Sequence, residues 1–325
     1  MSDQPIYLDH AASTPLHPEV LASILDYHQT SFANPESIHE AGQKAHLALE
    51  NARNTCAKIL NCKPLEIIFT PSGTFANNLA LLGYCRAHKT ATKNHIIISA
   101  IEHSSINETA KQLEKEGFEI TTLQPDNQGL IAPETLEQAI TPKTLLISII
   151  YGQNEIGTLQ DIAALAKIAN KHNIPFHSDA CQCANTELLD IQKLGLQLLT
   201  LNASKTYGPK GAGLLFKNSN IELQPITFGG HQENGLVPST HNMSGIIGLT
   251  KALELAQSKT ETERHRLTKL RDDFIHDLLH QIPKAQINGH RQKRLANNIS
   301  LTIPHLNGLE LLLKLNDEKI FVSTG

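Results

Sequence analysis

The run Leu198-Leu-Thr-Leu-Asn-Ala-Ser-Lys-Thr-Tyr-Gly-Pro-Lys-Gly-Ala-Gly213 is the most informative stretch of this 325-residue chain. Its apolar residues, followed by a Gly/Pro-rich turn, are typical of a buried strand that ends in a tight loop. A desolvated lysine at such a strand end loses its charge more easily than one in water, so it can form a Schiff base. Lys205 is the candidate, although a lone lysine in a turn is more often a surface residue. Lys210 is an alternative, but it lies within the turn itself.

Similar apolar runs alternate with helical patterns along most of the chain. We expect strands at 67–70, 95–99, 119–123, 144–149, 174–177, 198–202 and 213–216. Helices are expected at 38–60, 75–87, 105–116, 133–139 and 162–172. The first of these helices follows the capping-box pair Ser37 and Glu40. The alternation predicts an α/β fold with a mainly parallel sheet that is covered by helices on both faces.

The sequence pattern changes near Leu255. A charged helix at 260–281 is followed by a strand at 298–303, a helix at 309–315 and a strand at 320–323, which is typical of a small α+β domain. We therefore divide the chain into an N-terminal segment, 1–14, that packs with the small domain, a large domain, 15–255, and the small domain, 256–325. Because the last strand leaves an apolar helix face and a sheet edge uncovered, we expect the small domain to be incomplete.

Composition limits the classes of function. Lys and Arg number 28 and Asp and Glu 32, so the formal charge of −4 gives no general attraction to nucleic acid or acidic membranes. No apolar run is long enough to span a membrane, and the first residues lack the pattern of a signal peptide. Five cysteines argue against a disulfide framework, and their spacing does not predict a metal site. We expect a cytoplasmic protein that binds neither nucleic acid, membrane nor metal.

Two further features support a cofactor site near Lys205. Asp179 follows the strand at 174–177, at the carboxyl edge where α/β sheets build their sites, although a lone aspartate there could simply cap a helix. A lysine Schiff base with an acid partner for the pyridine nitrogen is the pattern of pyridoxal 5′-phosphate (PLP) enzymes. The run Thr70-Pro-Ser-Gly-Thr-Phe-Ala-Asn-Asn78 opens a helix after a strand, so its backbone N–H groups and the Thr74 hydroxyl would face an anion such as a phosphate.

Seven short motifs occur in an ordered series along the chain. They are Tyr7-Leu-Asp-His-Ala-Ala-Ser-Thr-Pro15, Phe32-Ala-Asn-Pro-Glu-Ser37, Ser72-Gly-Thr74, Glu102-His103, Asn154-Glu-Ile-Gly157, His177-Ser-Asp-Ala-Cys-Gln182 and Lys205-Thr-Tyr-Gly-Pro-Lys-Gly211. In this order the chain resembles a cysteine desulfurase of the iron–sulfur-assembly type, in the class V aminotransferase group, from Ile6 to Gly325. The resemblance implies the PLP-dependent transferase fold type I, with a mainly parallel seven-stranded sheet in the large domain and a smaller α+β domain.

The resemblance also implies roles for the residues around the ring of the cofactor. Lys205 would hold PLP covalently and later move the substrate Cα proton. Asp179 would pair with the pyridine nitrogen, and Gln182 would hydrogen-bond the phenolate oxygen. His103 would stack on the ring and take part in proton transfer. Asn154 would contact the ring hydroxyl side and the substrate carboxylate.

The phosphate of the cofactor is assigned by the same resemblance. Gly73 and Thr74 would bind it, together with Asn202 and Ser204, which stand where many members of the family have Ser-x-His-Lys. Thr240 would reach the phosphate of the partner subunit, and this role requires a homodimer.

The implied reaction converts L-cysteine to L-alanine and passes the sulfur to an enzyme cysteine, for a sulfur acceptor or an iron–sulfur scaffold protein. Phe321-Val-Ser-Thr-Gly325 matches the lead-in to the family's Ser-x-Gly-Ser-Ala-Cys loop, so we expect the nucleophilic cysteine to be missing from these 325 residues. The five cysteines present are expected to be structural. The alternatives are a selenocysteine lyase or other class V enzyme, a non-catalytic PLP-fold scaffold or dimer partner and, more remotely, a nucleotide-binding α/β protein.

Overall fold

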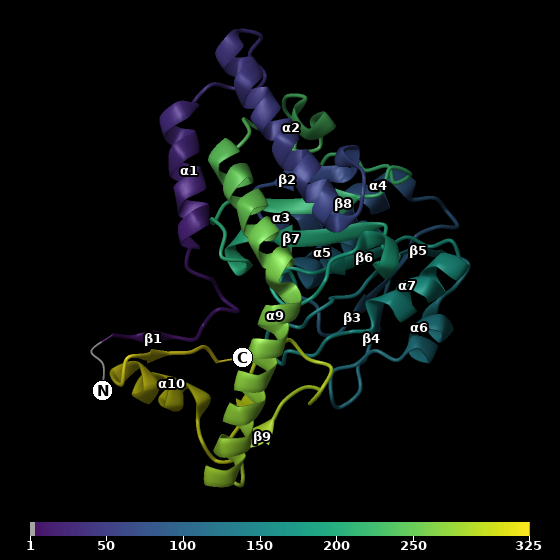
Figure 1. Cartoon of the computed structure of the whole chain (residues 1–325). Coiled ribbons are helices and arrows are strands. Elements are labelled where there is room, and N and C mark those ends of the chain that lie inside the picture. The colour runs from purple at the N-terminus through teal and green to yellow at the C-terminus, as the bar shows by residue number, and fades with distance from the viewer. Residues whose placement is uncertain (1–3, 325) are drawn as a thin grey trace.

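A seven-stranded sheet forms the centre of the computed structural model, which describes residues 4–324 (Figure 1). Its order is β2-β8-β7-β6-β5-β3-β4. The strands are β2 (Ile67–Thr70), β3 (His95–Ser99), β4 (Glu119–Leu123), β5 (Thr144–Ser148), β6 (Phe176–Asp179), β7 (Leu198–Asn202) and β8 (Gly213–Lys217). Strand β8 runs antiparallel to both of its neighbours, β2 and β7, and the other six strands all run in one direction. The carboxyl ends of the other strands therefore meet at one edge, and the expected mainly parallel α/β fold is confirmed.

Alternating side chains bury both faces of this sheet. In β2, Ile67 and Phe69 pack in the same cluster as α2, α7 and α9, whereas Ile68 packs in the cluster with α3, α4 and α5. This alternation follows from the two-residue repeat of a strand. Strand β6 begins two residues later than expected, after Pro175, and it includes Asp179. Asp179 is therefore the last residue of strand β6.

The helices cover the sheet in two layers (Figure 1). They are α1 (Pro18–Thr30), α2 (Glu40–Leu60), α3 (Gly73–Asn78), the π-helical η2 (Leu79–Gly83), α4 (Tyr84–His88), α5 (Ser104–Lys115), α6 (Pro133–Ala139), α7 (Ile162–Lys171) and α8 (Ile191–Leu194). The capping box expected at Ser37 and Glu40 is wrong. The N-cap of α2 is His39, whose Nδ1 accepts a hydrogen bond from Gly42 N at 3.2 Å.

One long helix, α9 (Met243–Gln281), connects the sheet layer to the smaller elements (Figure 1). It begins well before residue 260, where the charged helix was expected, and the proposed division between residues 255 and 256 lies within it. The smaller elements are β1 (Ile6–Tyr7) parallel to β11 (Ile320–Phe321), β9 (Gln286–Ile287) antiparallel to β10 (Leu301–Thr302), and α10 (Gly308–Asp317). Within residues 4–324, no helix has both the length and the apolar character that a bilayer crossing requires.

Candidate functional site

Lys205 lies at the carboxyl edge of the sheet, in the short 3-10 turn η3 (Ala203–Lys205) that follows β7. Its Nζ donates hydrogen bonds to the backbone oxygens of Ala11, at 2.7 Å, and Ala12. Burial lowers the pKa of Lys205, although nearby acidic groups, among them Asp179, oppose this effect. The amine is therefore placed where its neutral, nucleophilic form is more accessible than in water.

Asp179 ends the neighbouring strand β6 and is 5% exposed. Its Oδ2 accepts a hydrogen bond from Asn77 Nδ2 at 2.7 Å, and its Oδ1 accepts one from Cys181 N at 2.9 Å. These two donors fix the orientation of the buried carboxyl group. Because Asp179 pairs with Thr200 in the sheet, it lies beside the strand that leads to Lys205.

A hydrogen-bonded series extends from Asp179 to His103. Asn77 Nδ2 also donates to Ser105 Oγ at 2.9 Å, and Ser105 Oγ lies 2.8 Å from His103 Nδ1. Ser105 N donates to the same Nδ1 at 3.1 Å, so the proton of a neutral His103 ring lies on Nε2. Neither Asn77 nor Ser105 was predicted from the sequence. The four-residue spacing from Gly73 to Asn77, about one helical turn, could have indicated that Asn77 lies on the same face of the helix as the Gly73 turn.

The start of α3 packs closely against the ends of β6 and β7. Ser72 caps this helix, since its Oγ accepts from Phe75 N at 3.1 Å. A Cβ on Gly73 would lie 2.8 Å from Cys181 Sγ and 3.3 Å from the Cβ of Asn202. Only glycine allows so close an approach. The exposed Thr74 follows at the open end of this turn, which makes Gly73 and Thr74 neighbours of Asn202.

The N-terminal segment reaches the same edge. Ala11 O, which binds Lys205, also accepts from Gln182 Nε2 at 2.9 Å. Thr14 N donates to Ser204 O at 2.9 Å. Residues near position 11 therefore connect Gln182, Ser204 and Lys205, a contact that was not predicted from the sequence.

Two candidate residues are more loosely connected to this group. Asn154 follows β5 in a turn where its backbone oxygen accepts from Asn298 Nδ2 at 3.3 Å. Thr240 is exposed in the loop before α9. Within the part of the chain that the structure describes, no hydrogen bond joins either side chain to the other candidates. The structure thus brings most of the candidate residues together at the sheet edge around Lys205 and leaves Thr240 on the surface.

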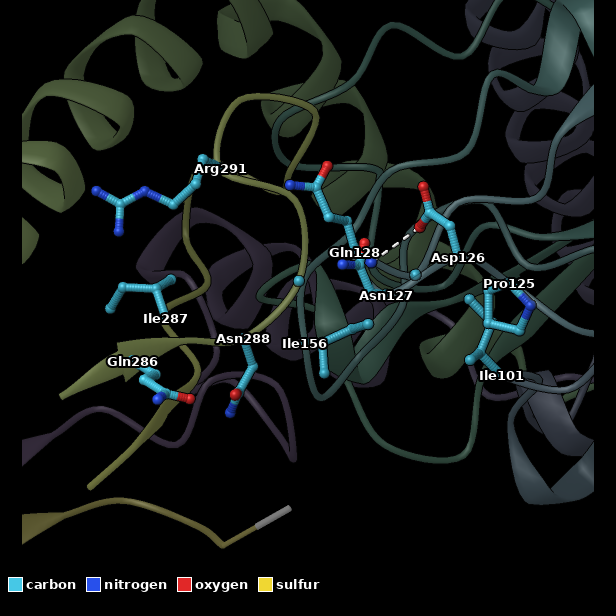
Figure 2. Close-up of a pocket in the computed structure, with 12 residues that line it drawn as sticks. Ile101, Pro125, Asp126, Asn127, Gln128, Ile156, Gln286, Ile287, Asn288 and Arg291 are labelled. Atoms are coloured by element: carbon cyan, nitrogen blue, oxygen red, sulfur yellow. Dashed lines mark hydrogen bonds between the residues drawn. The ribbon is translucent and has the colours of Figure 1, made fainter. Parts of the chain in front are cut away.

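A separate open pocket of about 510 Å³ lies between the loop after β4 and strand β9 (Figure 2). Its lining combines polar side chains, including those of Asp126, Gln128, Asn288 and Arg291, with apolar ones such as Ile156. Asp126 Oδ1 accepts a hydrogen bond from Gln128 N at 2.9 Å. None of the candidate residues described above lines this pocket, so it does not define the candidate site.

Residues 6–325 match the family model described as aminotransferase class V. The chain belongs to the class V aminotransferase family. Among the curated relatives of this chain is a cysteine desulfurase IscS of Dictyoglomus turgidum, 43% identical over 98% of this chain and 81% of the relative. A second, from Methanosarcina thermophila, is 41% identical over 98% of this chain and 79% of the relative.

Solved structures of this family are also similar. A NifS-like protein matches with a TM-score of 0.96 and 31% identity, over 99% of this chain and 88% of the other. The structure described as SspA in complex with cysteine matches with a TM-score of 0.83 and 33% identity, over 96% of this chain and 87% of the other. These matches confirm the expected family and the fold type I architecture.

PLP is the cofactor of this family, and the residues present fit it. The half-buried Lys205, the carboxyl group of Asp179 that two donors hold in place, and the close approach at Gly73 supply an amine, an acid and an open helix start. A lysine, an acidic partner and a phosphate cradle are the three groups that such a cofactor requires of its protein.

Proposed function

We propose that this chain carries the PLP and substrate site of a cysteine desulfurase, the enzyme that converts L-cysteine to L-alanine, and that the thiol that accepts the sulfur is not among its five cysteines. The observation that carries the proposal is the position of Lys205 and Asp179 at the carboxyl ends of the adjacent strands β7 and β6, beside the Gly73 turn. The substrate follows from the relatives, which are named cysteine desulfurase at 43% and 41% identity.

In this proposal Lys205 binds the cofactor covalently, Asp179 holds its pyridine nitrogen and Gln182 its phenolate oxygen. The hydrogen bonds that Asp179 accepts from Asn77 and Cys181 fix the carboxylate, so it can accept a further hydrogen bond from a protonated ring nitrogen without reorienting. Gln182 Nε2 is held by Ala11 O, which places the amide beside Lys205. Gly73, Thr74, Asn202 and Ser204 are proposed to surround the phosphate.

Proton movement is assigned to Lys205 and His103. When bound, PLP supplies a ring that stabilises negative charge at the substrate Cα. Lys205 removes the Cα proton, a role favoured by the burial that lowers the pKa of Lys205. His103 faces solvent from the start of α5 with Nδ1 occupied by Ser105, so its Nε2 is the nitrogen that can exchange a proton. Asn154 is proposed to orient the substrate carboxylate.

Sulfur transfer requires a thiolate, which attacks the substrate Sγ while the Cβ–S bond breaks and its electron pair returns to the carbon skeleton. Burial raises the pKa of all five thiols in this chain, those of Cys56 and Cys62 to about 12. A thiol that stays protonated at neutral pH is a poor nucleophile. We therefore propose that the acceptor thiol is none of these five.

The proposed assembly is a homodimer that passes sulfur to an acceptor or iron–sulfur scaffold protein in the cytoplasm. Three apolar side chains, on loops that contact the Thr240 loop, are almost fully exposed: Phe32 at 96%, Ile38 at 91% and Phe228 at 88%. Contacts of His241 with Glu36, and of Gly229 with Pro238, bring their loops to the Thr240 loop. Such a patch is typical of a protein interface. Five free cysteines suit the reducing cytoplasm.

The proposal is tested by incubating the PLP-loaded chain with L-cysteine in D₂O and following both amino acids by NMR. We expect deuterium at the cysteine Cα, because this step needs only Lys205 and its neighbours, and less than one alanine per chain. Lys205→Ala abolishes the exchange, whereas Lys210→Ala preserves it. Absence of exchange in the unaltered chain contradicts the proposed reaction. Repeated turnover to alanine would show that one of the five thiols accepts sulfur, with Cys181 the first to map.

A further inference from the structure

A cluster of buried charged side chains lies in the loop before α9, outside the candidate site. The side chain of Glu233 is 1% exposed, and its carboxylate accepts from Arg53 Nη2 at 2.8 Å and Nη1 at 2.9 Å. It also accepts from Phe69 N at 3.0 Å and lies 3.1 Å from His241 Nε2. Burial opposes ionisation, but hydrogen bonds from Arg53 and His241 outweigh it and hold the pKa of Glu233 below its usual value. One carboxylate thus connects α2, β2 and this loop.

The backbone of the loop adopts an unfavourable conformation at the same place. Glu233 has a φ of 47° and Asn234 a φ of 56°, both in the left-handed region. Side-chain-bearing residues enter this region only where surrounding contacts impose it. The bidentate pair with Arg53 and the hydrogen bond from Phe69 N are the contacts that hold Glu233 here.

These contacts fix the two residues that follow Thr240. The side chain of His241 is 5% exposed. Its Nδ1 lies 4.0 Å from Glu36 Oε1 and has no hydrogen-bond partner within residues 4–324, so the hydrogen bond to Glu233 is the shorter of the two contacts that hold the ring. Asn242 Nδ2 donates to Gly211 O at 2.9 Å, in the turn after Lys205. Thr240 is therefore exposed at a point whose backbone is anchored both to β2 and to the turn after Lys205.

We infer that Glu233 and His241 are positioning residues that act through Thr240, holding its hydroxyl where it completes the phosphate site of the partner subunit. The inference rests on the proposed homodimer and on the role proposed for Thr240. A hydroxyl on a freely moving loop loses conformational entropy when it binds a phosphate, whereas a pre-positioned hydroxyl does not. Because β2 leads into the Gly73 turn, the same cluster also sets the position of Thr240 relative to this subunit's own phosphate turn.

Binding of PLP and of pyridoxal, which lacks the phosphate, to the cofactor-free protein tests this inference. The variants are Thr240→Ala, His241→Asn, His241→Gln and the double variant Thr240→Ala/His241→Asn. Glutamine can place a nitrogen near the position of Nε2 and asparagine cannot, so the two His241 variants differ in the bond to Glu233. His276→Ala, an exposed histidine on α9, is the matched control.

We expect Thr240→Ala to weaken PLP binding by roughly 10-fold, the effect of one hydrogen bond to a charged group. His241→Asn should weaken it by roughly 5-fold, as expected for lost pre-organisation. His241→Gln and the His276 control should stay close to the unaltered protein. Pyridoxal binding should be unchanged throughout, and the double variant should match Thr240→Ala alone.

Three results would each overturn the inference. Equal loss of PLP and pyridoxal affinity in His241→Asn, or multiplied losses in the double variant, would show that His241 acts on the fold and not through Thr240. Unchanged PLP affinity in Thr240→Ala would refute the role of Thr240 itself, and the inference with it. Thermal unfolding of each cofactor-free variant identifies any that is merely destabilised. His241→Asn and His241→Gln both keep a polar amide at this position, so their PLP affinities can be compared between two folded proteins.

Discussion

Glu102 is a buried acid beside the candidate site, and its side chain predicts a pH dependence of stability. Its Oε1 accepts from Ser99 Oγ at 2.5 Å and Ile150 N at 2.7 Å, while its Oε2 has no hydrogen-bond partner within residues 4–324. Burial raises the pKa of Glu102 to about 8, from 4.5. The folded protein therefore retains a proton here that the unfolded chain releases, so stability falls as pH rises from about 5 to 8.

The variant Glu102→Gln lacks this titration but keeps an oxygen for both donors. Between pH 5 and pH 8.5 we expect the free energy of unfolding of the unaltered protein to fall relative to that of the variant, by up to about 4 kcal/mol. Urea denaturation of both proteins at the two pH values measures the difference. Parallel pH profiles would mean that Glu102 ionises as it does in the unfolded chain.

For single residues, the sequence predicts the position of those that follow directly after apolar runs. Lys205 and Asp179 follow such runs, so their place at one sheet edge could be predicted from the strand pattern alone. Asn77 and Ser105 could not be predicted in this way, because their importance lies in tertiary hydrogen bonds to Asp179 and His103. The N-terminal contacts of Lys205 with Ala11 were equally hidden, since they join residues 194 positions apart.

At the scale of elements, the approach of α3 to β6 and β7 yields a prediction for Gly73. The variant Gly73→Ala places a methyl group 2.8 Å from Cys181 Sγ, so we expect it to destabilise the fold by about 1–3 kcal/mol and to weaken PLP binding. Cys181→Ala alone should change PLP binding little. The double variant should recover most of the loss, because the sulfur that meets the methyl group is gone. Thermal unfolding and PLP titration measure both effects, and no recovery would locate the clash elsewhere.

Apolar runs predicted six of the seven central strands well, because strands buried on both faces carry a strong sequence signal; the edge strand β4, in which only Leu123 is buried, carries a weaker one. Helix ends were harder. His39 caps α2 although Ser37 and Glu40 had the spacing of a capping box. The start of α9 was missed because residues 243–253 are largely buried, and the charged pattern that marks a surface helix begins only later. Burial is decided by the neighbours of a helix, which local sequence does not specify.

At the scale of the whole molecule, the exposed apolar patch near Thr240 predicts a homodimer. We expect sedimentation of the PLP-bound protein at micromolar concentration to give a dimer. Phe228→Asp should raise the dimer dissociation constant by roughly 100-fold, because it places a charge in an apolar interface. Phe274→Asp, on the far part of α9, is the matched control and should remain dimeric. A PLP-saturated monomer would remove the reason for assigning Thr240 to the site.

The proposed function depends above all on Lys205 as the residue that binds PLP. The most direct measurement is borohydride reduction of the PLP-loaded chain, followed by peptide mass mapping of the attached pyridoxyl group. We predict one pyridoxyl group per chain, on Lys205, with loss of the visible absorbance band in Lys205→Ala and its retention in Lys210→Ala. A pyridoxyl group on Lys210 or another lysine, or an unchanged band in Lys205→Ala, would contradict this assignment.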